Sequence, residues 1–151
     1  MRSSACKRIL VPTDGSPRAL RAARVAAALA RKTGARLTAL YVLLERVPTA
    51  LDATLYASPA LSPELQHVLR EHAERALRAI ERVARRQGVA CERVIAHADH
   101  AWKSIVGNAR RRGCDLIVMA SRGRDSGAAA LLGSETTRVL AHSKIPVLVC
   151  R

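Results

Sequence analysis

Two glycines in the last third of the sequence have a spacing suited to a loop that binds an anion. Gly123 and Gly133 are separated by nine residues, and Ser134 follows the second glycine. Glycine adopts positive φ easily and leaves its amide open to approach, and the first N–H groups of a helix attract negative charge. The same loop offers further hydroxyls and cations, at Ser121, Ser126, Arg122 and Arg124. This chemistry predicts a phosphate-binding loop; the alternative is that Gly133 only permits a turn and Ser134 only caps a helix.

A second polar segment follows the first apolar run of the chain. Pro12, Thr13 and Asp14 end this run and lead into a Gly-Ser turn. In open parallel sheets, ligands bind beyond the carboxyl ends of the strands, where the strand order reverses. If the strand before Asp14 lies beside the strand before Gly123, both segments face one cleft. Asp14 is then a candidate ligand-binding residue, unless its carboxylate only bonds the amides of its own turn.

Other kinds of site have no comparable pattern. No Ser/His/Asp set or pair of carboxylates stands out for catalysis, and no lysine precedes Ser134 as a Walker A loop would require. His97 and His100, with Asp99 between them, have no further ligands clustered in sequence, so we expect no metal site formed by the protein alone. The four cysteines are scattered without a CxxC pair, which favours structural roles for Cys6, Cys91, Cys114 and Cys150. The sequence therefore predicts a binding protein and not an enzyme.

Apolar runs and amphipathic stretches alternate along the whole chain. Strands are expected at residues 7–12, 36–44, 90–96, 115–120 and 146–150, and helices at 17–34, 63–87, 101–112 and 134–145. This alternation predicts an α/β fold, a single open five-stranded parallel sheet with helices on both faces. Residues 45–62, which contain two prolines and no clear period, are expected to form a long excursion. The length of 151 residues and the lack of a linker predict one domain over residues 1–151.

The charge of the chain is strongly positive. Its 26 Lys and Arg residues against 12 acids give a formal net charge of +14, concentrated in residues 1–36 and 101–151. Such a surface attracts polyanions, including nucleic acid and nucleotide phosphates. Aromatic clusters for base stacking are missing, so we favour compositional drift over dedicated nucleic-acid binding. No apolar run is long enough for a membrane span or a signal peptide, which predicts a cytoplasmic protein.

The order of these motifs resembles the universal stress protein family over essentially the whole chain. The segments that carry the resemblance are KRILVPTDGS, LYVL, DLIVMASRG, GSETTRVL and IPVLV. The family's nucleotide-binding pattern is Gly, two residues, Gly, nine residues and Gly-Ser or Gly-Thr, and Gly123 and Gly133-Ser134 match it. Ala120 stands at the first glycine, which adds a methyl group near the ribose position. Glu135 replaces the usual apolar or small residue, and a carboxylate beside phosphate is unfavourable unless it faces water or a metal.

The resemblance implies a Rossmann-like, adenine nucleotide alpha-hydrolase-like fold and a role for each matching residue. Pro12, Thr13 and Asp14 would lie by the adenosine, with Asp14 placed for ribose hydroxyls or a phosphate-bound Mg²⁺. The backbone of Val42 would contact the adenine edge. Met119 and Ala120 would contact the sugar, and Arg122 and Gly123 would contact the phosphates. Ser134 and the backbone amides of Glu135 and Thr136 would bind the terminal phosphates.

The function expected from the resemblance is that of a cytoplasmic sensor that binds ATP with Mg²⁺ and at most hydrolyses it slowly. In this family the last strand commonly pairs across a two-fold axis, which implies a homodimer through residues 146–151. Two alternatives remain open at this point. One is the same fold without nucleotide binding, as a dimeric interaction protein, because of Ala120 and Glu135. The other is a basic protein that binds nucleic acid or another polyanion.

Overall fold

The protein consists of strands and helices in strict alternation. A computed structural model describes residues 6–45, 62–123 and 131–151. The elements in chain order are β1 (Arg8–Thr13), α1 (Pro17–Thr33), β2 (Arg36–Leu44), α2 (Pro63–Arg86), β3 (Cys91–Ala98), α3 (Ala101–Arg111), β4 (Leu116–Ala120), α4 (Ser134–His142) and β5 (Val147–Cys150). The predicted order of elements is confirmed.

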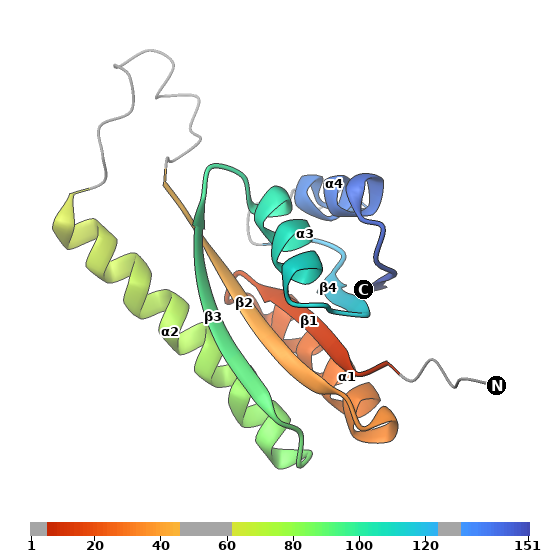
Figure 1. Cartoon of the computed structure of the whole chain (residues 1–151). Coiled ribbons are helices and arrows are strands. Elements are labelled where there is room, and N and C mark those ends of the chain that lie inside the picture. The colour runs from red at the N-terminus through yellow and green to blue at the C-terminus, as the bar shows by residue number, and fades with distance from the viewer. Residues whose placement is uncertain (1–5, 46–61, 124–130) are drawn as a thin grey trace.

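The five strands form one sheet in the order β3-β2-β1-β4-β5, and every neighbouring pair is parallel. Helices α1 and α2 lie on one face of this sheet, and α3 and α4 lie on the other (Figure 1). The predicted open parallel sheet with helices on both faces is therefore confirmed. Because the chain moves from β1 to β2 and β3 on one side and returns to β4 and β5 on the other, the strand order reverses between β1 and β4.

Small side chains bring α1 close to the sheet. Six alanines of this helix are buried, at positions 19, 22, 23, 26, 27 and 30. Four of them, at positions 23, 26, 27 and 30, form one core cluster with Ile9 and Val11 of β1, Val118 of β4, and Leu77 and Ile80 of α2. Alanine has no side-chain entropy to lose in a helix, so this stripe favours both the helix and its packing.

The other face of the sheet holds a second core cluster. Leu10, which points opposite to its neighbours in β1, packs there with Leu40, Ile117 and Met119. Helices α3 and α4 cover these residues with Ile105, Ala109 and Val139. Because alternate residues of each central strand are buried on opposite faces, the strands read as continuous apolar runs in the sequence.

The helix signals in the sequence have their expected effect at α1. The Ser16 side chain accepts a hydrogen bond from the Ala19 N–H at 3.1 Å, and Pro17 is the first helical residue. Gly34 ends the helix with φ of 75°, a left-handed conformation that glycine adopts without strain. The prediction was less accurate at β3, which continues through His97 and Ala98 because these residues pair with Leu43 and Leu44 of β2.

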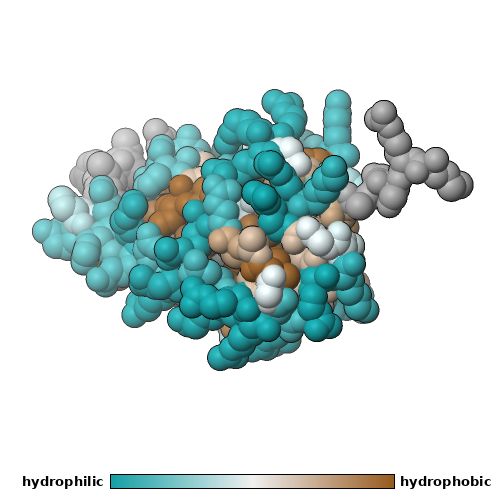
Figure 2. All heavy atoms as spheres, turned by 60° about the horizontal axis from the view of Figure 1, so that its bottom comes forward, coloured by the Kyte–Doolittle hydropathy of each residue, from teal (hydrophilic) through white to brown (hydrophobic). Residues whose placement is uncertain are grey.

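Basic residues gather at the amino end of the sheet. The last turns of three helices each contain two cations, Arg31 and Lys32 in α1, Arg85 and Arg86 in α2, and Arg110 and Arg111 in α3. Figure 2, in which the lower end of Figure 1 is turned toward the reader, shows a mainly hydrophilic surface there with small apolar areas. Cations near helix C-termini interact favourably with the helix dipole. Part of the positive charge therefore stabilises the fold.

We predict that the buried residues of α2 contribute more to the free energy of unfolding than its exposed residues do. Replacing Ile80, which is fully buried, by Ala removes packed methylene groups and leaves a cavity. The Ile80→Ala variant should lose about 2–5 kcal/mol in the free energy of unfolding, measured by urea denaturation. Val68 on the same helix is 56% exposed, so Val68→Ala should change it by less than about 0.5 kcal/mol. Equal losses in the two variants would contradict this assignment.

Candidate functional site

The segments with unusual chemistry meet where the strand order reverses. β1 pairs with β4, so the segment that follows Thr13 lies beside the segment that follows Ala120. This pairing meets the condition under which the two segments were expected to lie together. Right-handed crossovers carry the helices that follow β1 and β4 to opposite faces of the sheet, which leaves the carboxyl ends of these two strands between them.

Asp14 takes part in both a local turn and a contact with the second loop. Its Oδ1 accepts a hydrogen bond from the Ser16 N–H at 2.9 Å, so the turn alternative is correct for this oxygen. Its Oδ2 lies beside Gly123, because a Cβ atom added to that glycine would stand only 2.7 Å from it. The carboxylate therefore sits at the junction of the β1–α1 and β4–α4 loops.

Gly123 is needed for space and not for its backbone conformation. Gly123 does not adopt the positive φ that glycine makes accessible, because the described glycines with positive φ are Gly15, Gly34, Gly88 and Gly113. What glycine provides at position 123 is the missing Cβ, which allows Asp14 to approach the backbone. Of the two properties of glycine considered from the sequence, easy positive φ and a backbone open to approach, the second is the one that agrees with the structure.

Two residues that sequence reasoning missed support the turn that contains Asp14. His72 of α2 places its Nε2 3.3 Å from the Asp14 carbonyl oxygen, and Tyr41 of β2 meets the His72 ring edge-on with 5.8 Å between centroids. Gly15 has φ of 82°, and a Cβ there would stand 2.6 Å from His72 Nε2. The only sequence signal was a polar residue at an apolar-face position of the predicted helix, between Leu69 and Ala76.

Hydrogen bonds fix both ends of the β4–α4 connection. The Ser121 N–H donates to the Cys150 carbonyl oxygen at 2.7 Å, and the Gly133 N–H donates to the Ser121 carbonyl oxygen at 2.7 Å. A Cβ at Gly133 would lie 3.3 Å from the Arg122 Cα, so glycine allows this close return of the chain. The buried Thr136 hydroxyl donates to the Ala120 carbonyl oxygen at 3.0 Å. The first turn of α4 is thereby held against the end of β4.

The N-terminus of α4 presents donors at this junction. Gly133 is the N-cap residue and Ser134 is the first helical residue, so the alternative that Ser134 is the cap is wrong. Because the N-cap is a glycine, it has no side chain that could accept a hydrogen bond from the first turn of α4. The first regular helix bond in this turn runs from the Thr137 N–H to the Gly133 carbonyl oxygen. The N–H groups of residues 134–136 therefore form the kind of helix start at which anions bind.

The Glu135 carboxylate is directed at a neighbouring helix. Its Oε2 accepts a hydrogen bond from the Trp102 N–H in the first turn of α3 at 2.7 Å. Its Oε1 lies 3.3 Å from the Arg138 guanidinium. The N-cap of α3 is His100, which makes no side-chain cap bond, so Glu135 supplies the missing acceptor. From the sequence, we expected this carboxylate to face water or a metal, and a helix N-terminus was not foreseen as its partner.

The other residues implied by the resemblance differ in how deeply they are buried. Val42 is the first residue of β2 beyond the end of β1, since the register pairs Thr13 with Tyr41. Met119 is buried in the core cluster under α3 and α4, and Ala120 is 9% exposed. Pro12 is buried, while Arg122 is partly exposed at the start of the loop. Their roles in binding stay predictions.

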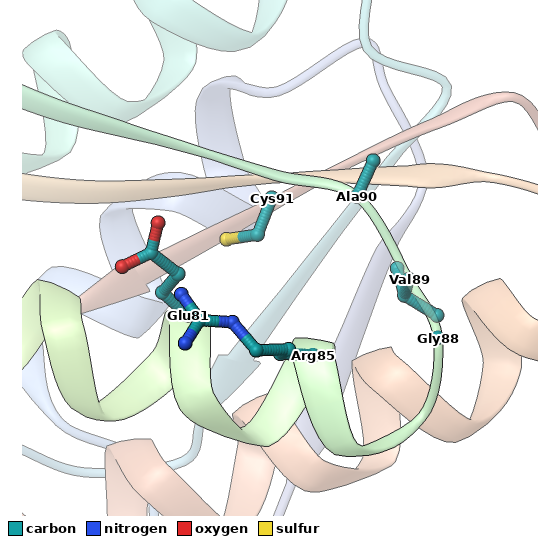
Figure 3. A pocket seen from close by; sticks show the side chains of 6 residues that line it. All are labelled: Glu81, Arg85, Gly88, Val89, Ala90 and Cys91. Atoms are coloured by element: carbon teal, nitrogen blue, oxygen red, sulfur yellow. The ribbon is translucent and has the colours of Figure 1, made fainter.

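Two hollows on the surface of the described residues lie away from this junction. One, of about 320 Å³, is at the amino end of β3, where the Cys91 side chain turns toward Glu81 and Arg85 of α2 (Figure 3). Burial raises the pKa of the Cys91 thiol to about 11, which keeps it protonated and weakly nucleophilic at neutral pH. A second hollow, of about 440 Å³, lies between the ends of β2 and β3 and the start of α2.

Some expectations fall outside the part of the chain that is described. Arg124, Ser126 and residues 46–61 of the excursion belong to the segments that the structure leaves out. Within the described residues, His, Cys, Asp and Glu form no group of three or more that could hold a metal ion. None of the described helices combines the length and the apolar character that crossing a membrane requires.

The fold and this junction define a class of protein, a parallel α/β protein with a candidate ligand site at the reversal of strand order. A sequence model described as the universal stress protein family matches residues 5–151. This chain therefore belongs to the universal stress protein family.

Relatives over nearly the full length agree with this assignment. A universal stress protein of Methanocaldococcus jannaschii is 34% identical over 145 residues, which cover 96% of this chain and 82% of the relative. The solved structure of the universal stress protein UspA from Lactobacillus plantarum has a TM-score of 0.79 and 30% identity, and covers 98% of this chain and 99% of its own. A universal stress protein solved in complex with cAMP has a TM-score of 0.70 and 25% identity, with 98% of each chain covered.

We predict that Gly123→Ala disturbs the junction. The added Cβ would stand 2.7 Å from Asp14 Oδ2, and rotation of the carboxylate would break its bond to the Ser16 N–H. The amide chemical shifts of residues 14–16 should therefore change, and the melting temperature should fall. Gly107→Ala is the matched control, because its Cβ would contact only the end of the flexible Arg111 side chain within α3. This control should raise the free energy of unfolding by about 0.5–1 kcal/mol. Unchanged shifts in Gly123→Ala would contradict the contact.

Proposed function

We propose that this protein, as one domain over residues 1–151, is a sensor that binds ATP with Mg²⁺ in the cleft between β1 and β4. The observation that carries the proposal is the approach of Asp14 to Gly123 beside the N-terminus of α4. A glycine backbone, a carboxylate and the N–H groups of the first turn of a helix at one point form a suitable environment for a nucleotide with its metal ion. The cAMP complex of a related protein supports an adenine nucleotide as the ligand.

The phosphate end of the proposed site is the start of α4. Here the N–H groups of residues 134–136 and the exposed Ser134 side chain are the donors. The bonds of Gly133 and Thr136 to the end of β4 hold these donors in place before a ligand arrives. Preformed donors cost less ordering on binding, which favours affinity for phosphate.

The nucleoside end is proposed to lie between the carboxyl ends of β1 and β2. Val42 extends past the end of β1, so its backbone is a candidate partner for the adenine edge. Asp14 is the candidate for ribose hydroxyls or for Mg²⁺ on the phosphates, where a hard oxygen ligand suits the ion. Ala120 adds only a methyl group, and the residue as a whole is 9% exposed.

The alternative of an interaction protein without nucleotide depended on Ala120 and Glu135. The Glu135 carboxylate accepts a hydrogen bond from the Trp102 N–H of α3, and Ala120, which the resemblance places near the ribose, is only 9% exposed. These contacts favour the nucleotide-binding proposal over that alternative. We propose no catalytic residue, and expect hydrolysis to be slow at most.

We predict that the purified protein binds ATP in the presence of Mg²⁺, as measured by isothermal titration calorimetry. Gly133→Val should abolish binding while a cooperative melting transition remains. The reason is that the new side chain would press on the Arg122 backbone, 3.3 Å from the added Cβ, and move the loop that contacts phosphate. No heat of binding at millimolar ATP would contradict the proposal. Nucleic-acid binding that falls steeply with salt and ignores Gly133→Val would instead favour the polyanion alternative.

We further propose that the protein forms a homodimer through residues 146–151. Among the described strands β5 is an edge of the sheet, and Leu148 in this strand is 39% exposed. An exposed apolar edge strand is a template for pairing with another chain. A second copy would cover both the backbone groups and the apolar side chains.

The proposed dimer leads to a prediction about Leu148. Leu148→Lys adds a charge to the edge strand, which natural proteins use to block strand pairing. Sedimentation equilibrium should give a dimer for the parent protein and a monomer for this variant. Leu140→Lys is the control, because Leu140 is similarly exposed, at 41%, on α4 instead of β5. A monomeric parent protein, or a variant that stays dimeric, would contradict the proposed interface.

A further inference from the structure

Glu135 joins the first turns of two helices. It is the second residue of α4, and its Oε2 accepts a hydrogen bond from the Trp102 N–H, the second residue of α3, at 2.7 Å. A second contact between the same helices is the Trp102 ring, which stacks on His142 with 4.3 Å between centroids. The first turn of α4 is thus bonded to α3 on one side and, through Thr136, to the end of β4 on the other.

This arrangement satisfies the charge of Glu135 without a ligand. The carboxylate lies near the positive ends of two helix dipoles, its own at α4 and that of α3. It also replaces the side-chain cap that His100 does not provide. A cap bond of this kind stabilises a helix start, and a charged acceptor makes the bond stronger than a neutral one. The carboxylate is therefore committed to α3 through its bond to the Trp102 N–H.

We propose that Glu135 is a positioning residue for the phosphate end of the site. By tying α4 to α3, it fixes the orientation of the turn whose N–H groups would meet phosphate. This inference rests on the proposed nucleotide-binding function and adds to it the residue that sets the geometry of the phosphate donors. It reverses the expectation from sequence, in which the negative charge of Glu135 weakens phosphate binding.

Two substitutions separate positioning from repulsion. Glu135→Gln removes the charge but keeps an oxygen that can accept from the Trp102 N–H. Glu135→Ala removes both the charge and the acceptor. If Glu135 positions α4, only the Ala variant loses phosphate affinity; if Glu135 repels phosphate, both variants gain it.

The test measures ATP and adenosine binding by calorimetry for the parent protein and both variants. We expect Glu135→Ala to bind ATP about 10-fold more weakly, the effect of losing one helix cap bond. Glu135→Gln should stay within about threefold of the parent, since a neutral acceptor keeps part of the bond. Adenosine affinity should be equal in all three proteins, because adenosine does not reach α4. Arg138→Ala is the control, because it removes only the exposed pair at 3.3 Å and leaves the Trp102 bond.

Hydrogen exchange of the Trp102 amide provides a readout without any ligand. Exchange should be about 10-fold faster in Glu135→Ala than in the parent, because the amide loses its acceptor. Unchanged exchange would contradict the bond itself. Tighter ATP binding by Glu135→Ala, or equal weakening of ATP and adenosine, would overturn the positioning role. A parent protein that binds neither ligand would contradict the proposed function, and this role with it, even where the exchange result supports the bond.

Discussion

The pairing of β1 with β4 is the constraint on which the candidate site depends. These strands are distant in sequence, yet their parallel pairing places the ends of both at one point. The chain leaves β1 for one face of the sheet and β4 for the other, so no crossover helix covers that point. The polar chemistry that each strand end carries, a turn with Asp14 and a loop with Gly123, is brought together only by this pairing.

Close packing at this point explains the residue types better than backbone conformation does. Gly123 and Gly133 are both at positions where a Cβ would meet protein atoms, Asp14 Oδ2 in one case and the Arg122 Cα in the other. Neither has positive φ. Each glycine therefore makes room for a close contact at one end of the β4–α4 connection, and the family pattern describes a shape as much as a ligand.

Signals within a few residues of each other were enough to predict most of the fold. Ser16 and Pro17 mark the start of α1 and Gly34 marks its end, because each acts on its own turn. The apolar runs located all five strands. The site contacts that were missed join distant parts of the chain. His72 reaches Asp14 across 58 residues, and Glu135 reaches Trp102 across 33. Such contacts depend on how helices pack on the sheet, which periodicity does not specify.

The stacked indole at the junction of α3 and α4 has a practical consequence. Trp102 is the single tryptophan of the chain, which also has no phenylalanine and only two tyrosines. Its backbone N–H bonds Glu135 and its ring rests on His142, so its surroundings are set by the relative placement of these two helices. The protein thus contains one tryptophan fluorophore between α3 and α4, and relative movements of these two helices can be followed by its emission without any attached label.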